Sequence, residues 1–343
     1  MKNKKNCIIV TGGGTAGHIM PIIALLDSLK ENFNQIVYVG SKNGMEKDII
    51  KNYSFVKFFA IDTVKFDRTS LLRNFKIPFL LLKGIFQSRK IIKECKPTCI
   101  FSKGGYVSLP VCLASNVPII AHESDLTLGL ANKIIYKKCK VLCTNFYETS
   151  KTLKKAVYTG LPMKTNNGCE KLEFLIKDGL PNLLILGGSL GSRIINQIIF
   201  ENIFQICSKF NVIHIVGAKN KINAKFPENY NQVEFVQNMH QIYSTTNFAI
   251  SRAGANTICE LKSYNIPMLL IPLSKKVSRG DQEMNAKNFE EQGLALTLKE
   301  ENLNKENLFT KLNLLSQMQK KKFKGLINSG TNNVMKQILK HSL

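Results

Sequence analysis

A glycine-rich segment near the start of the chain, from Gly12 to His18, has residue types that could bind and activate a substrate. It follows the apolar run Cys7–Val10 and precedes a helical pattern over Pro21–Lys30, with the proline near the first turn. We therefore expect it to join a first strand to a first helix, where backbone N–H groups can bind an anion at the positive helix end. His18 lies in the same turn, and a histidine side chain can accept a proton in catalysis. Together these features predict chemistry on a phosphorylated substrate.

The glycine spacing in this segment also matches the dinucleotide-binding fingerprint Gly-x-Gly-x-x-Gly. That fingerprint needs an acidic residue about 20 residues further on, at the end of the second strand. The second strand is expected at Ile36–Val39 and is followed by Gly40, while Glu46 and Asp48 come too late. The missing carboxylate disfavours NAD, and no Gly-Lys-Ser/Thr follows to form a P-loop. A tight turn without a ligand is the structural alternative.

Two polar segments of the first half also follow apolar runs. The segment Ser102-Lys103-Gly104-Gly105-Tyr106 contains a glycine pair that offers backbone donors for an oxyanion or a sugar hydroxyl. The segment His122-Glu123-Ser124-Asp125 precedes a helical pattern that carries Asn132 and Lys133. A carboxylate there could hold a sugar hydroxyl or accept a proton. The alternatives are a plain turn for the first segment and helix capping by Ser124 or Asp125 for the second.

Two segments of the second half could bind a nucleotide sugar. The segment from Arg252 to Glu260 leaves a strand, passes through Gly254 and begins a helix, whose N-terminus can hold a diphosphate. Glu260 could accept two hydrogen bonds from a ribose diol, or it could pair with Thr257 in a capping box. In the later segment 272–286, Asp281 and Gln282 could bind sugar hydroxyls, and a solvated loop is the alternative.

A parallel sheet is needed to position these segments. Short apolar runs alternate with helical patterns, which is typical of parallel α/β units. We expect strands near 7–10, 36–39, 55–60, 98–101, 118–121, 141–144, 183–186, 212–216, 233–236, 248–250 and 268–271. A second glycine turn follows the strand at 183–186. The sequence thus predicts two doubly wound domains, with ligands at the carboxyl ends of the strands in a cleft between the domains.

The length of 343 residues also suits two domains. We place an N-terminal domain at 1–160 and a C-terminal domain at 161–325. The tail, 326–343, is expected to form a helix that packs back on the N-terminal domain.

The charge balance bears on the partners. The chain has 48 basic and 24 acidic residues, which gives a net charge of +24. Only six of the basic residues are arginine and the lysines are spread along the chain, whereas a nucleic-acid reader would use arginine forks and basic stripes. The charge therefore favours an anionic membrane face or a pyrophosphate substrate over nucleic acid.

The nine cysteines are scattered, and no histidine pair completes a zinc site, so we expect free thiols, a reducing compartment and no metal. No stretch is long and apolar enough to span a bilayer or to serve as a signal peptide, which favours the cytoplasm. Residues 71–86 combine aliphatic and aromatic side chains with Arg73, Lys76 and Lys83, and Arg89 follows. This segment fits an interfacial membrane patch, and an ordinary core helix is the alternative.

Seven motifs occur in order along the chain: Gly-Gly-Thr15-Ala-Gly-His18, Gly104-Gly105-Tyr106-Val-Ser, His122-Glu123, Asn132-Lys133, Gly187-Gly-Ser-x-Gly191, Arg252-x-Gly254-Ala-x-Thr257-x-x-Glu260 and Asp281-Gln282-x-x-Asn285-Ala286. As an ordered set they resemble the MurG family of glycosyltransferases, family 28, which acts in peptidoglycan synthesis. The resemblance implies a GT-B fold and an inverting transfer of GlcNAc. The donor would be UDP-GlcNAc, and the acceptor would be the C4 hydroxyl of undecaprenyl-pyrophosphoryl-MurNAc-pentapeptide (lipid I), giving lipid II.

The resemblance also implies where the enzyme works and what it needs. The N-terminal domain would take the lipid-linked acceptor and the C-terminal domain would take UDP-GlcNAc. No cofactor or metal is implied, and no protein partner can be named. The protein would be cytoplasmic and peripheral on the inner face of the cell membrane.

Each matching position receives a role from the resemblance. For the catalytic base, our own hypothesis is His18, because an imidazole lies in the glycine-rich loop, and Glu123 is its rival. Donor-binding positions would be Thr15, Ala16, Gly17, Asp125, Lys164, Ser189, Val236, Arg252, Gly254, Ala255, Asn256, Thr257, Glu260, Asp281 and Gln282. Acceptor-binding positions would be Gly13, Gly14, Gly104, Gly105, Tyr106 and Asn132. Among the donor positions, Glu260 would hold the uridine ribose, the Val236 backbone the uracil, and Gln282 the GlcNAc hydroxyls.

Three positions depart from the family pattern, with Asp125 in place of Asn, Lys164 in place of Arg and Leu190 in place of Gln. Lys164 keeps the charge but lacks the bidentate fork, and Asp125 can accept but not donate a hydrogen bond. Other hypotheses are a different GT-B enzyme, such as a diacylglycerol glycosyltransferase or a sugar-nucleotide 2-epimerase, and a non-catalytic nucleotide-sugar-binding module. A 2-epimerase would need further acid/base carboxylates, of which the sequence offers no clear set.

Overall fold

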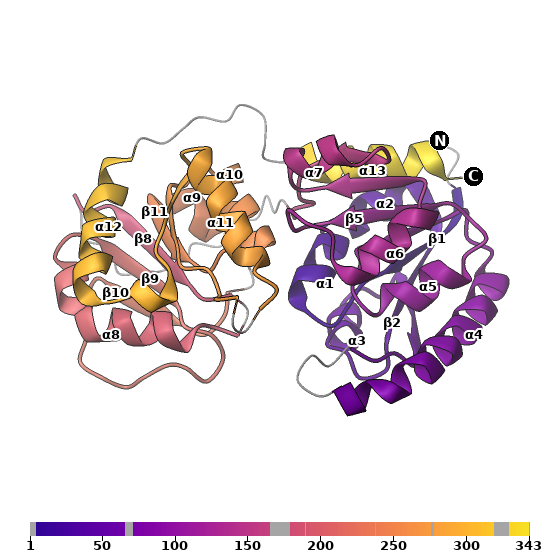
Figure 1. Cartoon of the computed structure of the whole chain (residues 1–343), viewed down its shortest axis with the longest axis horizontal. Helices are drawn as coiled ribbons and strands as arrows, with labels where there is room; N and C mark the ends of the chain where they lie inside the picture. Colours follow the sequence, from indigo (N-terminus) through magenta and orange to yellow (C-terminus); the bar gives the residue numbers. More distant parts are fainter. Residues whose placement is uncertain are drawn as a thin grey trace. The chain divides into compact units, whose positions relative to one another are not determined.

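A computed structural model of the chain describes residues 5–65, 71–164, 179–188, 190–236, 238–275, 278–318 and 329–342. The chain divides into two compact units (Figure 1). The first unit holds residues 1–164 together with 328–343, and the second holds residues 165–327. Among the described residues, no helix is long and apolar enough to cross a membrane.

The first unit is built on a parallel sheet of seven strands in the order β3-β2-β1-β4-β5-β6-β7. The strands are β1 (Lys5–Thr11), β2 (Phe33–Ser41), β3 (Val56–Ile61), β4 (Cys99–Ser102), β5 (Ile119–Glu123), β6 (Val141–Thr144) and β7 (Ala156–Tyr158). Ile9 of β1 is in register with Val37 on one side and with Ile100 on the other. The chain order reverses direction at β1, which is where such sheets bind ligands. The segments that follow β1, β4 and β5 therefore emerge at one edge of the sheet.

Helices cover both faces of this sheet. They are α1 (Ala16–Ile23), α2 (Leu26–Asn32), α3 (Glu46–Ile50), α4 (Ile77–Cys95), α5 (Ser108–Ala114), α6 (Leu130–Lys138), α7 (Tyr147–Thr152) and α13 (Ser329–His341), with the 3-10 helix η1 (Leu71–Lys76) before α4. Buried side chains of α1, α2, α3 and α13 form the core on one face, and those of α4, α5 and α6 form the core on the other.

The prediction of one helix over Pro21–Lys30 is wrong, because two helices cover this part of the chain. Helix α1 begins at Ala16, so Pro21 lies inside it rather than in its first turn. The helix then breaks after Ile23, because the N–H of Leu25 bonds to the carbonyl of Ile22 three residues back. The second helix starts at Leu26. The earlier start brings Ala16, Gly17 and His18 into the first turn of α1.

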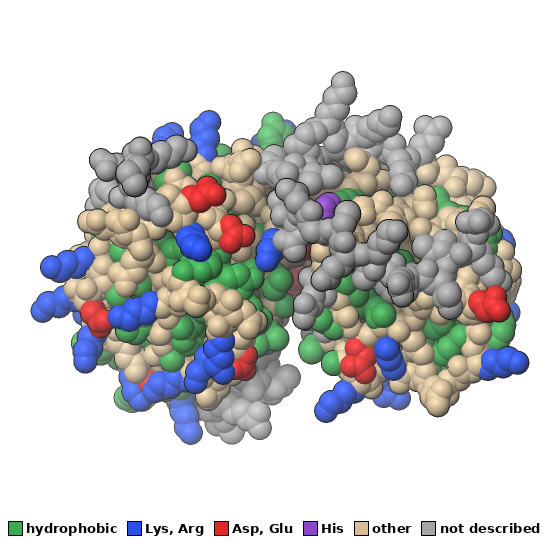
Figure 2. All heavy atoms as spheres, turned by 180° about the vertical axis from the view of Figure 1, so that it is seen from behind, with side chains coloured by type: hydrophobic (Ala, Val, Ile, Leu, Met, Phe, Trp, Pro, Cys, Tyr) green, Lys and Arg blue, Asp and Glu red, His purple; other side chains and the backbone are tan. Residues whose placement is uncertain are grey.

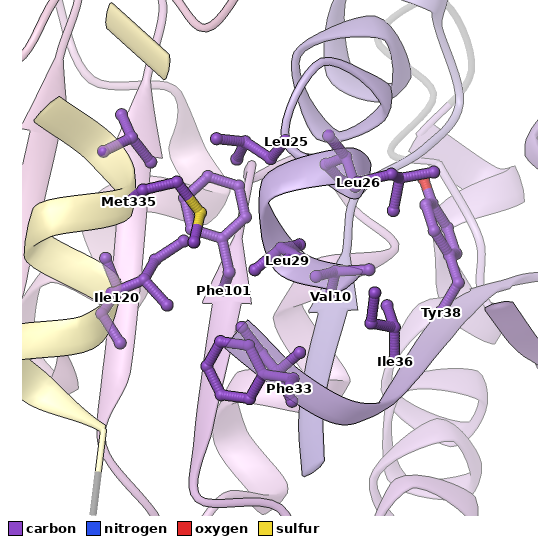
Figure 3. Close-up of a cluster of buried hydrophobic side chains, with 14 of the residues drawn as sticks. Val10, Leu25, Leu26, Leu29, Phe33, Ile36, Tyr38, Phe101, Ile120 and Met335 are labelled. Carbon is purple, nitrogen blue, oxygen red and sulfur yellow. The ribbon is translucent and has the colours of Figure 1, made fainter. Parts of the chain in front are cut away.

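Helix α13 completes the core of the first unit. Val334, Met335 and Ile338 are buried there, and Met335 points toward Phe101 of β4 and Ile120 of β5 (Figure 3). The hydroxyl of Thr331 exchanges hydrogen bonds with the backbone of Met163, at 3.1 and 2.9 Å. The last described helix is thus an integral part of the fold that the first strand begins.

The second unit has a parallel sheet of six strands in the order β10-β9-β8-β11-β12-β13. Its strands are β8 (Asn182–Leu186), β9 (Asn211–Ile215), β10 (Tyr230–Val233), β11 (Phe248–Ser251), β12 (Met268–Leu270) and β13 (Ala295–Thr297). Its helices are α8 (Arg193–Cys207), α9 (Met239–Thr245), α10 (Ala255–Ser263), α11 (Asp281–Glu291) and α12 (Lys305–Gln317), with the 3-10 helix η2 (Glu300–Asn302).

Three strand predictions need correction. The strand expected at 233–236 lies at Tyr230–Val233, because the pairing with β9 places Tyr230 beside Val212 and leaves Phe235 exposed. The short strands β7 and β13 were not predicted. Each has three residues, too few for an apolar run or an alternation to stand out.

Candidate active site

The glycine-rich loop after β1 is shaped by contacts that only glycine allows. Gly14 has φ +84°, and a Cβ there would lie 2.4 Å from Cε1 of Tyr106. A Cβ on Gly13 would lie 2.6 Å from Oε1 of Glu46. Thr15 precedes the first turn of α1, and its hydroxyl is 2.8 Å from Nδ1 of His18. The loop thus fixes the orientation of a half-buried imidazole.

The loop after β4 meets the glycine-rich loop. Gly104 and Gly105 both have positive φ, +84° and +81°. A Cβ on Gly105 would lie 3.4 Å from Nε2 of His18, and one on Gly104 would lie 2.8 Å from Nδ2 of Asn132. The predicted acceptor-binding positions, which are Gly13, Gly14, Gly104, Gly105, Tyr106 and Asn132, therefore gather around His18 in the first unit.

The carboxylate of Glu123 is buried and fully hydrogen-bonded. It accepts the N–H groups of Ser124 and Asp125 on Oε1, at 2.9 and 3.1 Å. On Oε2 it accepts the Gly129 N–H and the Asn132 amide, at 2.9 and 3.0 Å. A carboxylate has about four acceptor sites, and here all are used. Glu123 therefore anchors the loop before α6, and the geometry argues against it as the base.

The capping hypothesis for Ser124 and Asp125 is wrong. Helix α6 begins at Leu130, and its N-cap residue is Gly129. The carboxylate of Glu123 binds the N–H groups of the loop, so the helix begins several residues after Asp125. Asp125 stays in that loop, half-buried.

A buried lysine, Lys103, lies beside this cluster, and no local pattern in the sequence predicts its burial. Its side chain is 2% exposed, and Nζ donates to the hydroxyl of Ser124. Burial, together with the charge of Lys103, lowers the pKa of the enclosed His122 well below its usual range. His122 is therefore a neutral imidazole, whose Nε2 faces the Gly160 carbonyl at 3.4 Å.

The remaining donor-binding predictions in the first unit are less clustered. Ala16 and Gly17 open helix α1 beside Thr15. Lys164 is exposed, and its ammonium lies 5.9 Å from the centre of the Tyr53 ring.

In the second unit, a backbone hydrogen bond closes the glycine turn that follows β8. Gly188 and Gly191 have positive φ, and the Gly191 N–H bonds to the Gly188 carbonyl at 3.0 Å. Helix α8 then begins with Ser192 as its N-cap residue. Ser189, a predicted donor position, lies outside the described residues. Leu190, which replaces the family's Gln, is 81% exposed.

Helix α10 begins at Ala255 after Gly254, and no side chain caps its N-terminus. A Cβ on Gly254 would meet no atom within 4 Å, so there is space for a ligand beside Gly254 at this helix N-terminus. This is the arrangement that binds a diphosphate at a helix N-terminus. Thr257 is the third residue of the same helix.

The carboxylate of Glu260 is held by a residue that the sequence did not reveal. The Tyr243 hydroxyl, from α9, donates to Oε2 of Glu260 at 2.7 Å. This contact replaces the capping box proposed with Thr257. Burial raises the pKa of Glu260, and the hydrogen bond from Tyr243 partly offsets that rise. The Tyr264 ring packs at a tilt against that of Tyr243, and its hydroxyl hydrogen-bonds to His240. Burial raises the pKa of Tyr264 to about 12.

The guanidinium of Arg252 makes contacts within the second unit. It forms an ion pair with Glu300 of η2 and donates to the Ile271 carbonyl at 3.0 Å. Glu300 in turn accepts the Ser274 N–H at 3.3 Å. Arg252 therefore fixes the start of the loop after β12, and its contact with the donor stays a prediction.

The end of that loop carries the last predicted donor residues. Asp281 and Gln282 open helix α11 after Gly280, whose φ is +80°. Asp281 pairs with Arg279 at 3.4 Å, and Oε1 of Gln282 accepts the Leu273 N–H at 3.0 Å. Val236, the predicted uracil contact, is half-buried just after β10.

Comparison with known proteins shows what class of protein this fold and site define. Residues 8–144 match the glycosyltransferase family 28 N-terminal domain, and residues 182–340 match the glycosyltransferase family 28 C-terminal domain. The crystal structure of Acinetobacter baumannii MurG is similar with a TM-score of 0.75 and 24% identity, covering 98% of this chain and 99% of that chain. The UDP-GlcNAc 2-epimerase of Methanocaldococcus jannaschii is similar with a TM-score of 0.64 at 14% identity, covering 98% of this chain and all of that chain. The fold is that of the GT-B glycosyltransferases.

Curated relatives place the chain more closely. A Clostridium tetani protein is 45% identical over 347 residues, 98% of this chain and 97% of that protein. A Clostridium botulinum protein is 46% identical over 343 residues, 96% of this chain and 97% of that protein. Both are named UDP-N-acetylglucosamine--N-acetylmuramyl-(pentapeptide) pyrophosphoryl-undecaprenol N-acetylglucosamine transferase. This chain belongs to glycosyltransferase family 28, as a member of its MurG group.

Proposed function

We propose that this chain transfers GlcNAc from UDP-GlcNAc to the C4 hydroxyl of lipid I, with inversion at the anomeric carbon, to give lipid II. The observation that carries the proposal is the 45% identity to the Clostridium tetani transferase over 98% of this chain. The described residues add two groups of side chains suited to the chemistry. One surrounds His18 in the first unit, and the other surrounds the N-terminus of α10 in the second.

His18 is the base in this proposal. This role requires the tautomer in which Nδ1–H donates to the Thr15 hydroxyl and the imidazole lone pair lies on Nε2, the atom nearer to Gly105. The acceptor oxygen attacks C1 of GlcNAc as its proton passes to Nε2. The bond from C1 to the UDP oxygen breaks, and UDP leaves with the electron pair. Glu123 takes no part in this step, because its four hydrogen bonds anchor the loop.

The second unit supplies the donor contacts. The N–H groups at the start of α10 stabilise the charge that develops on the departing diphosphate. Glu260, held by Tyr243, accepts hydrogen bonds from the ribose hydroxyls. Gln282 uses Oε1 within the protein, and in this proposal its Nε2 donates to the GlcNAc hydroxyls.

We further propose that α4 and η1 dock on the cytoplasmic face of the inner membrane. Phe75, Phe79, Leu82 and Phe86 are exposed at the spacing of one helical face. Gly84, Ser88, Ile91 and Ile92 are buried on the opposite face. The exposed face combines large apolar side chains with Lys83 and Arg89, which suits an anionic bilayer surface. The core-helix alternative explains the buried face alone.

The direct test is incubation with UDP-GlcNAc and a lipid I analogue, with detection of the disaccharide product by mass spectrometry. We expect the product, and UDP release that depends on the acceptor. UDP release at the same rate without acceptor, or binding of UDP-GlcNAc with no product, would count against the transferase. Conversion of UDP-GlcNAc to its 2-epimer would favour the epimerase hypothesis.

A further inference from the structure

The side chain of Glu46, the first residue of α3, is completely buried against the glycine-rich loop. Its Oε1 accepts the Ser41 N–H at 2.7 Å, and its Oε2 accepts the Gly14 N–H at 3.4 Å. Glycines make the room for it, since a Cβ on Gly13 would lie 2.6 Å from Oε1 and one on Gly44 would lie 2.2 Å from it. The carboxylate therefore connects the end of β2 to the loop that follows β1.

This carboxylate is a buried charge held by backbone donors. Among the described residues, no lysine or arginine forms an ion pair with it. Burying a charged group without a partner of opposite charge is costly unless its hydrogen bonds are satisfied. A carboxylate buried in this way therefore suggests a specific structural role for Glu46. The charge also reaches Tyr106, whose pKa is raised by burial and by Glu46.

The residues next to Glu46 are those that gather around His18. There is no room for a side chain at position 14, because the Tyr106 ring lies against Gly14. Thr15, the next residue, holds Nδ1 of His18. A shift of Gly14 would therefore displace the Tyr106 ring and the Thr15–His18 pair together.

We propose that Glu46 is the positioning residue of the acceptor site, and that its carboxylate is the anion bound by the Gly14 N–H. The glycine-rich loop then serves to hold His18 and Tyr106, and the acceptor diphosphate is bound by groups other than the Gly14 N–H. The inference rests on the proposed function, because it says which part of that site Glu46 sets. Glu46 acts through the loop and does not touch the reacting atoms.

The test compares Glu46→Gln with Asp48→Asn. Glutamine keeps the shape of the side chain, but it loses the charge and has only one oxygen for two backbone donors. Asp48 lies two residues further along α3 and is exposed beside Lys51, so it is the matched control. Because a displacement of about 1 Å can slow a reaction on the order of 100-fold, we expect Glu46→Gln to lower kcat/KM for the lipid I analogue on the order of 10- to 100-fold. The KM for UDP-GlcNAc should stay within about twofold of wild type, since the proposed contacts with the ribose and the diphosphate are on α10 of the second unit.

Hydrogen–deuterium exchange gives a readout that does not depend on activity. Uptake in the peptide covering residues 12–18 should rise in Glu46→Gln and stay unchanged in Asp48→Asn. If wild type has no activity on lipid I, the proposed function fails, while the exchange experiment still decides whether Glu46 holds the loop. Unchanged uptake, or wild-type kcat/KM for the acceptor, would overturn the inference.

A second variant covers the case in which Glu46→Gln does not fold. Glu46→Asp keeps the charge and shortens the side chain by one methylene, so it cannot reach both Ser41 and Gly14. The same loss of acceptor kcat/KM and the same rise in exchange are expected. A Glu46→Asp protein with wild-type acceptor kinetics would contradict the proposed positioning.

Discussion

At the scale of single residues, the imidazole of His18 is set by its contact with Thr15. We expect His18→Gln to lower kcat by about 10²- to 10⁴-fold, the usual range for loss of a general base. Binding of UDP-GlcNAc, measured by calorimetry, should be unchanged, since the predicted ribose and diphosphate contacts are on α10. Near-normal turnover in His18→Gln would show that another group takes the proton.

The contact between Tyr243 and Glu260 predicts a change in the pH dependence of donor binding. Glu260 must be ionised to accept two hydrogen bonds from a ribose diol. Burial already raises the pKa of Glu260, and the Tyr243 hydroxyl lowers it, so Tyr243→Phe should raise this pKa further. Donor affinity, which is lost as the pH falls through that pKa, should then begin to fall at a higher pH. UDP titrations by calorimetry between about pH 4.5 and 8 would measure the shift.

Tyr264→Phe is the control for this experiment. Tyr264 lies close enough to Glu260 for the carboxylate to raise its pKa, and it hydrogen-bonds to His240. Removing the Tyr264 hydroxyl leaves the contact between Tyr243 and Glu260 in place, so the acid limb should stay close to that of wild type. Superimposable profiles for Tyr243→Phe and wild type would contradict a role for this hydroxyl.

The sequence could reveal site residues only where local patterning marked them. Gly104, Gly105 and Asn132 stood out because glycines and polar side chains follow apolar runs. Glu46, Lys103 and Tyr243 carry no local signal, since their importance comes from burial against segments distant in the chain. The ion pair of Arg252 could not be predicted either, because its partner, Glu300, lies 48 residues further along the chain.

At the scale of elements, helix α13 gives a direct test of the first unit's core. The side chain of Ile338 is completely buried there. We expect Ile338→Ala to lower the free energy of unfolding of the first unit by about 2–5 kcal/mol, from lost apolar burial and the cavity left behind. Urea denaturation would measure it, with the exposed Lys336→Ala as control. Equal midpoints for the two variants would mean that α13 does not stabilise the unit.

Most strands could be predicted because both faces of a parallel sheet are buried, which gives continuous apolar runs such as that of β1. The prediction errors occur where contacts with distant segments determine where an element begins and ends. Strand β10 is shifted because its partner β9 selects Tyr230–Val233, and α6 starts late because Glu123 holds the preceding loop. Such outcomes depend on contacts across the fold, which the local pattern does not contain.

At the scale of the whole molecule, the surface charge and the exposed face of α4 predict membrane binding. Figure 2 shows Lys and Arg side chains scattered over the visible surface rather than gathered in one stripe. The net charge of +24 should make binding to anionic vesicles weaken with salt. Phe79→Glu should reduce vesicle binding by about 10- to 100-fold, since burying one Phe contributes about 1.5–3 kcal/mol.

Flotation with vesicles of anionic lipid would measure this effect. Phe204→Glu is the control, because Phe204 of α8 is 66% exposed and Phe79 of α4 is 77% exposed. Binding that drops equally in both variants would indicate non-specific loss, and binding insensitive to Phe79→Glu would leave α4 as a helix that simply covers the sheet.

The return of the chain to the first unit through α13 has a consequence for biosynthesis. Residues 334, 335 and 338 are translated only after the entire second unit, yet they fill the core that β1 begins. A nascent chain can therefore fold the second unit while the first still exposes apolar surface over Phe101 and Ile120. The site around His18 would mature last, and the ribosome would release each molecule before it could act on its substrate.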